Sequence, residues 1–243
     1  MNRKRELAKK VLAVRLRYLR KHTKKLPYAS ASLSFAIVVL AIVKWLIIVP
    51  YFDKLFYLAS IGDFEKIKYE LEHMPVLLKY SPFLIAADML ILSVSLGLLA
   101  YIFHRVSKIR YISYLDMARL LLFFSTIMCA LSTILWANLA RAFIQGNTET
   151  IMELIGPIWF SEKMFRLGFS AASILLAFTF YKLRDILHDL CGIDRRILVV
   201  MLLLNIVSIY DIIFALPFYV YFCIIRRRSI LSFAYIDIIK YVF

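Results

Sequence analysis

Apolar segments of about twenty residues recur along this chain and constrain its fold more than any other feature. Roughly 20 consecutive apolar residues are needed for a helix to cross a hydrocarbon core about 30 Å thick, and several segments reach that length. The composition agrees, because 63% of the 243 residues are hydrophobic, whereas a soluble domain is about 45–50% apolar. The sequence therefore predicts an all-α fold, a polytopic membrane helical bundle without a sizeable soluble domain.

Four of these segments are predicted to be membrane spans. They are Ala29–Val49, Pro82–Phe103, Met117–Ala140 and Leu167–Tyr181. The connections between them alternate in charge: two are basic (104–116 and 182–196), and two hold acids and bases in near balance (51–81 and 141–166). Because Lys and Arg in short loops stay on the cytoplasmic side, the basic connections are predicted inside and the balanced ones outside. Segment 51–81 also has the spacing of one or two short interfacial helices.

The N-terminus is the most basic part of the chain. Residues 1–28 carry eleven Lys and Arg against a single acid. Apolar residues recur there at helical spacing, with bases on the other faces; they are Leu7, Val11, Val14 and Tyr18. This pattern predicts a basic amphipathic helix that lies on an anionic leaflet.

The remaining chain divides into two predicted parts. Residues 29–225 are expected to form the transmembrane bundle, and residues 226–243 a basic, amphipathic interfacial tail. The formal net charge of +15 is explained by basic cytoplasmic connections. We therefore expect a multi-pass protein of the cell (plasma) membrane with a cytoplasmic N-terminus. The chain has only one Gln and four Asn, a scarcity that suggests a thermophilic source.

The last apolar block, residues 197–225, departs from the pattern of single spans. Its 29 residues make a helix of about 43 Å, and arginines flank both ends. One helix would place those arginines on opposite sides of the membrane, against the charge rule. A hairpin that turns near Tyr210–Asp211, with Pro217 bending the return arm, keeps both ends inside. Its arms are short for full crossings, so a re-entrant pair is favoured, and a fifth or sixth span stays open.

A weak internal repeat appears at a constant offset of 84 residues. Identical pairs include Gly62 and Gly146, Glu65 and Glu149, Ile67 and Ile151, Lys79 and Lys163, and His104 and His188. The offset aligns two copies of a unit in which an outer helix precedes a span. Two copies in the same orientation would be a parallel duplication of the kind found in transporters. Chance agreement among apolar residues is the alternative.

Two ionisable residues fall inside predicted spans, where charge is costly and commonly functional. Lys44 lies six residues before Pro50, and Asp88 lies six residues after Pro82. Both are therefore expected about 9 Å from the outer surface. Three arrangements are open: the two residues form an ion pair, they line a transport pathway, or each lies alone near the headgroups.

A polar stripe is predicted in the last apolar block. Asn205, Ser208 and Asp211 follow one another at three-residue steps. Lipid cannot satisfy such groups, so the stripe must face protein or water. It either lines a pore or proton path, or joins the block to its neighbours by hydrogen bonds, with Asp211 capping the turn.

One cytoplasmic connection gathers residues that suit an enzyme. They are Asp185, His188, Asp189, Arg195 and Arg196. Two carboxylates beside two arginines suit a metal ion and a phosphate headgroup, as a lipid-modifying enzyme requires. A second acidic cluster is missing, and no phosphate loop, nucleophile elbow or HExxH element occurs. No catalytic residue, metal site or cofactor is therefore predicted.

The sequence favours a transport or translocation component, a subunit of a larger homo- or hetero-oligomeric assembly in the lipid bilayer. A bundle this small needs partners to enclose a pathway, and its basic inner face suits a polyanion such as DNA as cargo or partner. The alternatives are a lipid-modifying membrane enzyme that uses the Asp/His cluster, and a membrane scaffold for cytoplasmic partners.

Overall fold

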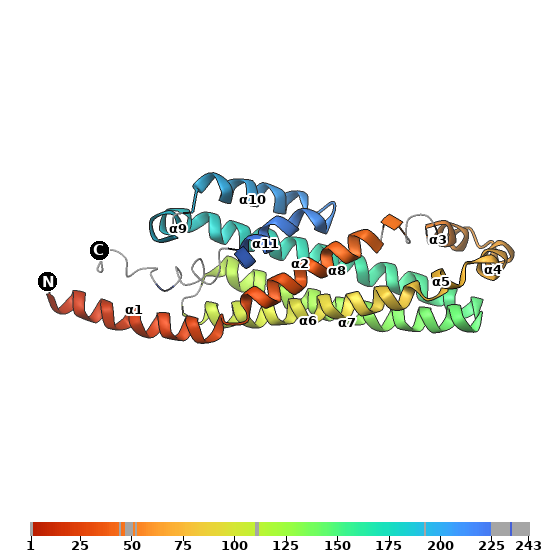
Figure 1. Cartoon of the computed structure of the whole chain (residues 1–243), viewed down its shortest axis with the longest axis horizontal. Coiled ribbons are helices and arrows are strands. Elements are labelled where there is room, and N and C mark those ends of the chain that lie inside the picture. Colours follow the sequence, from red (N-terminus) through yellow and green to blue (C-terminus); the bar gives the residue numbers. More distant parts are fainter. Residues whose placement is uncertain are drawn as a thin grey trace.

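The computed structural model describes residues 2–43, 45–46, 51, 53–109, 112–191, 193–224 and 234. In these residues the regular structure is entirely helical, without a strand. Four of the described helices are long and apolar enough to cross a membrane: α2 (Leu26–Val43), α6 (Ser81–Ser107), α7 (Ser113–Gln145) and α8 (Thr148–Lys182). They run side by side in an elongated bundle (Figure 1). The predicted all-α class with four membrane helices is confirmed.

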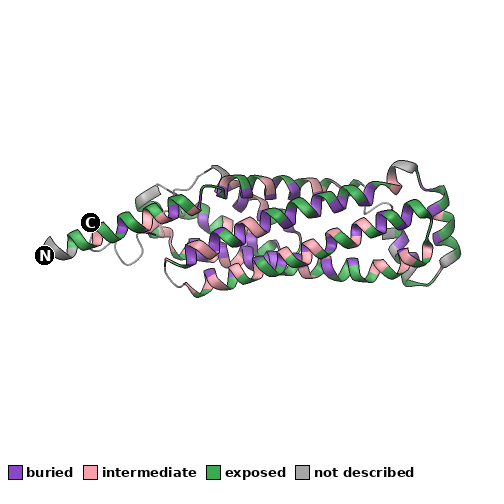
Figure 2. Ribbon diagram, turned by 90° about the horizontal axis from the view of Figure 1, so that it is seen from below, coloured by how far each residue is buried: buried purple, intermediate pink, exposed green. Residues whose placement is uncertain are grey.

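The long helices pack in chain order. α6 lies between α2 and α7, and α7 packs along α8. The C-terminal helices complete the bundle, because α10 (Arg195–Val207) packs on α8 and α11 (Leu216–Ile224) packs on α2. Buried residues follow the inner faces of the long helices, and exposed residues follow the outer faces (Figure 2).

Three short helices lie at the end of the bundle where α7 meets α8, here called the distal end (Figure 1). They are α3 (Asp53–Ser60), α4 (Phe64–His73) and α5 (Val76–Lys79), one more than the sequence predicted. Asp63 caps α4 by accepting a hydrogen bond from the backbone N–H of Lys66. Hydrogen bonds from Lys66 hold the pKa of the Asp63 carboxyl below its usual value.

At the opposite end, α1 (Asn2–His22) projects beyond the bundle along its long axis (Figures 1 and 2). Leu12 and Leu19 are buried, whereas Leu7 and Val14 of the predicted apolar face are 64% and 68% exposed. The helix therefore has two apolar faces: Leu12 and Leu19 pack, and most of the predicted face stays exposed. The position of this helix on an anionic leaflet stays a prediction.

Residues 141–166, predicted as an outer connection, are helical apart from a two-residue turn. α7 continues to Gln145 and α8 begins at Thr148, so only Gly146 and Asn147 lie between the two helices. Gly146 has the left-handed φ of 66°, which suits a residue without a Cβ, and the Asn147 side chain accepts from the Thr150 N–H. The fourth span thus starts before the predicted Leu167.

Aromatic and basic side chains pair at two levels of the bundle. Near the α1 end, Arg105 lies over Tyr101 and Arg184 over Tyr181; further along α8, Lys163 lies over Trp159. Such residues are enriched at membrane–water interfaces. Trp159 and Tyr181 are 22 positions apart (181 − 159), or about 33 Å of helix, which matches a hydrocarbon core of about 30 Å. α8 then extends about 16 Å past Trp159 toward the distal end.

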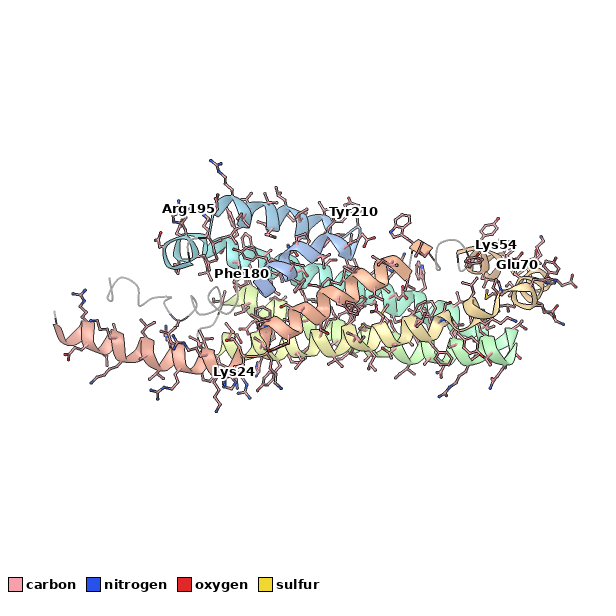
Figure 3. All side chains as sticks on the ribbon, viewed as in Figure 1. Lys24, Lys54, Glu70, Phe180, Arg195 and Tyr210 are labelled. Carbon is pink, nitrogen blue, oxygen red and sulfur yellow. The ribbon has the colours of Figure 1, made fainter. Side chains whose placement is uncertain are left out.

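The last apolar block folds back on itself, as the hairpin prediction required. α10 ends at Val207, a turn occupies residues 208–210, and a 3₁₀ helix, η2 (Ile212–Ala215), leads into α11. In Figure 3, Arg195 lies toward the α1 end and Tyr210 lies about halfway along the bundle. The 13 residues of α10 span about 20 Å, less than a full crossing.

The proposed repeat has one local structural counterpart. Gly62 has φ 73° and Gly146 has φ 66°, and the next residue of each copy, Asp63 or Asn147, caps a helix. Beyond these caps the copies differ, because one is divided into α4, α5 and α6 while α8 is continuous. The duplication stays a prediction.

Candidate intramembrane site

Asp88 lies on α6, seven positions after the first residue of the helix. Its side chain is buried, with the residue 3% exposed, and neither carboxylate oxygen has a hydrogen-bond partner. Ile85, Met89 and Leu92 around it are fully buried. On the facing helix, the Cys129 Sγ donates to the Met89 carbonyl oxygen at 3.1 Å. Asp88 is therefore a carboxyl enclosed by apolar packing.

The predicted partner of Asp88, Lys44, lies outside the described residues. Within them, α2 and α6 are joined by the Ser32 and Ser95 hydroxyls, whose oxygens are 2.7 Å apart. The two helices are antiparallel (Figure 1), so Asp88, seven positions from Ser95, lies level with Val39. α2 from Leu26 to Val43 holds no charged residue, and the predicted ion pair stays untested.

Small hydroxyl residues occupy the contacts of α2 and α6 with their neighbours. Ser93 donates to the Thr126 carbonyl oxygen of α7 at 3.2 Å. The Oγ atoms of Ser30 and Ser34 are buried on α2 and have no partner. Small residues let membrane helices approach closely, but an unpaired buried hydroxyl needs another explanation, such as an ordered water.

A charged network joins α7 to α8. The Trp136 Nε1 donates to Glu162 Oε1 at 2.8 Å, and the Arg166 Nη2 donates to Glu162 Oε2 at 3.3 Å. One turn away, the Ser132 and Ser161 hydroxyl oxygens are 2.8 Å apart. Sequence analysis missed this network because Glu162 and Arg166 were assigned to a connection. Their four-residue spacing, typical of helical ion pairs, was the available signal.

The polar stripe of the hairpin is divided between two roles. Asn205 and Ser208 are buried; the Asn205 amide donates to the Met201 carbonyl, and the Ser208 hydroxyl donates to the Asn205 carbonyl. The Ser170 hydroxyl of α8 donates to the Ser208 carbonyl oxygen at 2.8 Å, while Asn205 Oδ1 is buried without a partner. Asp211 is partly exposed and caps η2 through the Ile213 N–H at 3.1 Å.

The inner-face cluster forms exposed ion pairs. Arg195 and Asp185 are joined at 3.3 Å, and His188 and Asp189 at 3.2 Å, with all four side chains more than half exposed. Arg196 is exposed, and its N–H is accepted by the Asp194 carboxylate at the start of α10. In the described part of the chain, no three His, Cys, Asp or Glu side chains are placed to hold a metal ion.

At the base of α1, Arg105 of α6 bonds to Tyr101 at 3.1 Å and also to Tyr18. This packing of α1 on α6 also places His22 close to the cations Arg105, Lys21 and Lys108. Burial lowers the pKa of His22, and Arg105, Lys21 and Lys108 lower it further. This junction therefore favours an uncharged His22 where α1 leaves the bundle.

Known proteins do not identify this site. Protein-family models, curated proteins and solved structures contain no match to the chain. Its function has to be inferred from the residues themselves.

Proposed function

We propose that this chain is a multi-pass transport or translocation component of the cell membrane, with the α1 end in the cytoplasm. The main support is a set of buried polar atoms without partners inside the membrane helices and the hairpin. They belong to Ser30, Ser34, Asp88 and Asn205. Hydrocarbon cannot satisfy such groups, and in native proteins they commonly meet water or an ion. Water beside these atoms would form part of a transport pathway through the bundle.

The C-terminal hairpin supports the same proposal as a re-entrant element. Ser170 is 11 positions from both Trp159 and Tyr181 (170 − 159 and 181 − 170), and its hydroxyl holds the Ser208 carbonyl of the turn. The turn therefore lies at the middle of the proposed membrane layer. Transporters bind their cargo at this depth, where helices are broken, because irregular backbone is tolerated there only beside protein or water.

Tyr210 favours an assembly of several subunits. It lies at the tip of the hairpin and is 88% exposed. A tyrosine hydroxyl surrounded by hydrocarbon needs a hydrogen-bond partner. A second copy or another membrane subunit against this tip supplies one, and such a contact also helps a small bundle to enclose a pathway.

Cysteine labelling tests whether water reaches the hairpin. The three native cysteines are replaced by alanine, and Asn205→Cys is compared with Leu203→Cys on the same helix, which is 56% exposed on the outer surface. A charged, membrane-impermeant thiol reagent is expected to label position 205 from the α1 side, because the proposal places water at the unpaired Asn205 oxygen. Position 203 is expected to stay unlabelled, since it faces lipid.

Two outcomes of the labelling contradict the proposal. Equal labelling of both positions would place the hairpin outside the membrane. Failure to label position 205 from either side would leave the orphaned Asn205 oxygen without water. A cysteine at Glu65, on α4, reports which end faces outward; labelling there from the cytoplasm reverses the proposed orientation.

The projecting α1 favours a second candidate function, a docking arm for a cytoplasmic partner such as DNA. Lys9, Lys10 and Arg17 are exposed along it, and the helix points away from the membrane helices (Figure 1). Clustered cations on one helix suit phosphate binding. The lipid-modifying alternative has no comparable support, because its residues form exposed ion pairs.

Duplex DNA binding at increasing salt tests the docking arm. The triple variant of Lys9, Lys10 and Arg17 to Gln is expected to reduce the slope of log affinity against log salt by about 2.7, at about 0.9 per lost phosphate contact. The matched control changes Lys54, Lys66 and Lys68 to Gln at the distal end and should leave the slope unchanged. If the wild-type protein does not bind DNA at low salt, this role is wrong.

A further inference from the structure

We propose that the Asp88 carboxyl is a proton-binding site through which this protein carries protons across the membrane. This inference rests on the proposed transport function and names the ion that the same buried site takes. The observation that carries it is a side chain more than nine-tenths buried whose two oxygens accept no hydrogen bond.

No described cation neutralises Asp88. α2 has no charged residue from Leu26 to Val43, and the titratable group that α7 brings beside it is the Cys129 thiol. On α8, the Glu162 carboxylate is bonded to Trp136 and Arg166. The other helices that pack on α6 are α5 and α1, at its two ends. Their titratable groups there are Lys79 and His22.

The surroundings suit a proton rather than a metal ion. A bound metal cation takes several oxygen ligands at once, and the described residues bring no three His, Cys, Asp or Glu groups together. An ionised carboxylate without a partner is strongly disfavoured in an apolar interior. Binding one proton converts the carboxylate to a neutral carboxyl, and the reverse step returns that proton to water; no electron moves.

An asparagine would fill the same space without a charge to lose. Asn has nearly the shape of Asp but cannot release a proton at this position. A purely structural role for Asp88 therefore predicts that Asp88→Asn keeps full function, whereas proton exchange predicts that the variant loses it.

Proton flux into proteoliposomes tests the inference with the full chain. Vesicles hold a pH-sensitive dye, and a potassium gradient with an ionophore drives proton entry. Wild-type protein is expected to acidify the interior, and Asp88→Asn is expected to fall to the rate of protein-free vesicles. The control Asp63→Asn makes the same change at a partly exposed helix cap, where Asn caps as well as Asp, and should keep the wild-type rate.

Infrared spectroscopy gives a readout that does not depend on transport. At neutral pH the wild-type protein should show the carbonyl band of a protonated carboxyl, shifted in heavy water and absent from Asp88→Asn. Absence of this band from the wild type means that Asp88 is ionised, which overturns the inference.

The wild type can show this band and still carry protons no faster than protein-free vesicles. Asp88 would then be a neutral carboxyl with a structural role only, and that result also overturns the inference. If Asp88→Asn does not fold, these two wild-type measurements still decide. The labelling of position 205 is independent of them, so failure of the transport proposal can be told apart from failure of the proton site.

Discussion

Replacing Gly168 with valine is expected to push α7 away from α8 and to destabilise the bundle strongly. A Cβ atom at Gly168 would lie 2.7 Å from the Ser125 Oγ and 2.9 Å from the Phe124 Cδ1. Overpacking a tight contact costs about 1–3 kcal/mol, and the two further methyl groups of valine enter the same contact. Thermal unfolding in detergent, followed by tryptophan fluorescence, should show a large fall in Tm.

Gly156 provides a matched control on the same helix. No heavy atom lies within 4 Å of a Cβ built there, and alanine favours a helix over glycine by about 1 kcal/mol. Gly156→Ala is therefore expected to keep or raise Tm, whereas Gly168→Ala should lower it. Equal stability of the two alanine variants would contradict the close approach of α7 and α8.

Truncation of Trp136 is the second change with a large expected effect. This side chain is fully buried and donates its indole N–H to Glu162. Trp136→Ala is expected to lose about 3–5 kcal/mol of unfolding free energy, the usual cost of emptying a buried aromatic site. Trp136→Phe keeps most of the ring but leaves Glu162 without one donor, at a cost of about 1–3 kcal/mol.

A double-mutant cycle separates the hydrogen bond from the packing. In a Glu162→Gln background the indole donor meets a neutral acceptor, so Trp136→Phe should cost less than in the wild type. Trp159→Phe serves as the control, because Trp159 is 56% exposed and only lies over Lys163. If Trp136→Phe costs the same in both backgrounds, the negative charge of Glu162 adds no stability to this contact.

The membrane class and the turn of the hairpin were predictable because each depends on sequence-local information. Length and apolar content set the four long helices. Charge on both sides of residues 197–225 required the chain to fold back, and the turn lies at residues 208–210, next to the predicted position. Helix α1 was also recognised, although its buried face was not. The sequence does not single out Leu12 and Leu19 as the packed residues, because apolar residues occupy more than one face of this helix.

The errors arise from contacts between residues distant in sequence. Glu162 and Arg166 looked like loop residues because Trp136, the partner that makes a charge tolerable in α8, lies 26 positions away. The ion pairs of the inner-face cluster, Arg195 with Asp185 and His188 with Asp189, likewise were not indicated by sequence spacing. Asp88 was identifiable as a buried acid, but its lack of hydrogen-bond partners required the packing of α6 against α7.

The shortness of the C-terminal hairpin has a consequence for biogenesis. α10 has 13 residues and α11 has 9, and a segment needs roughly 20 apolar residues to be inserted as an independent span. The ribosome also makes these arms after α2, α6, α7 and α8. The hairpin must therefore enter a bundle that is already assembled, guided by the surfaces of α8 and α2 rather than by the insertion machinery.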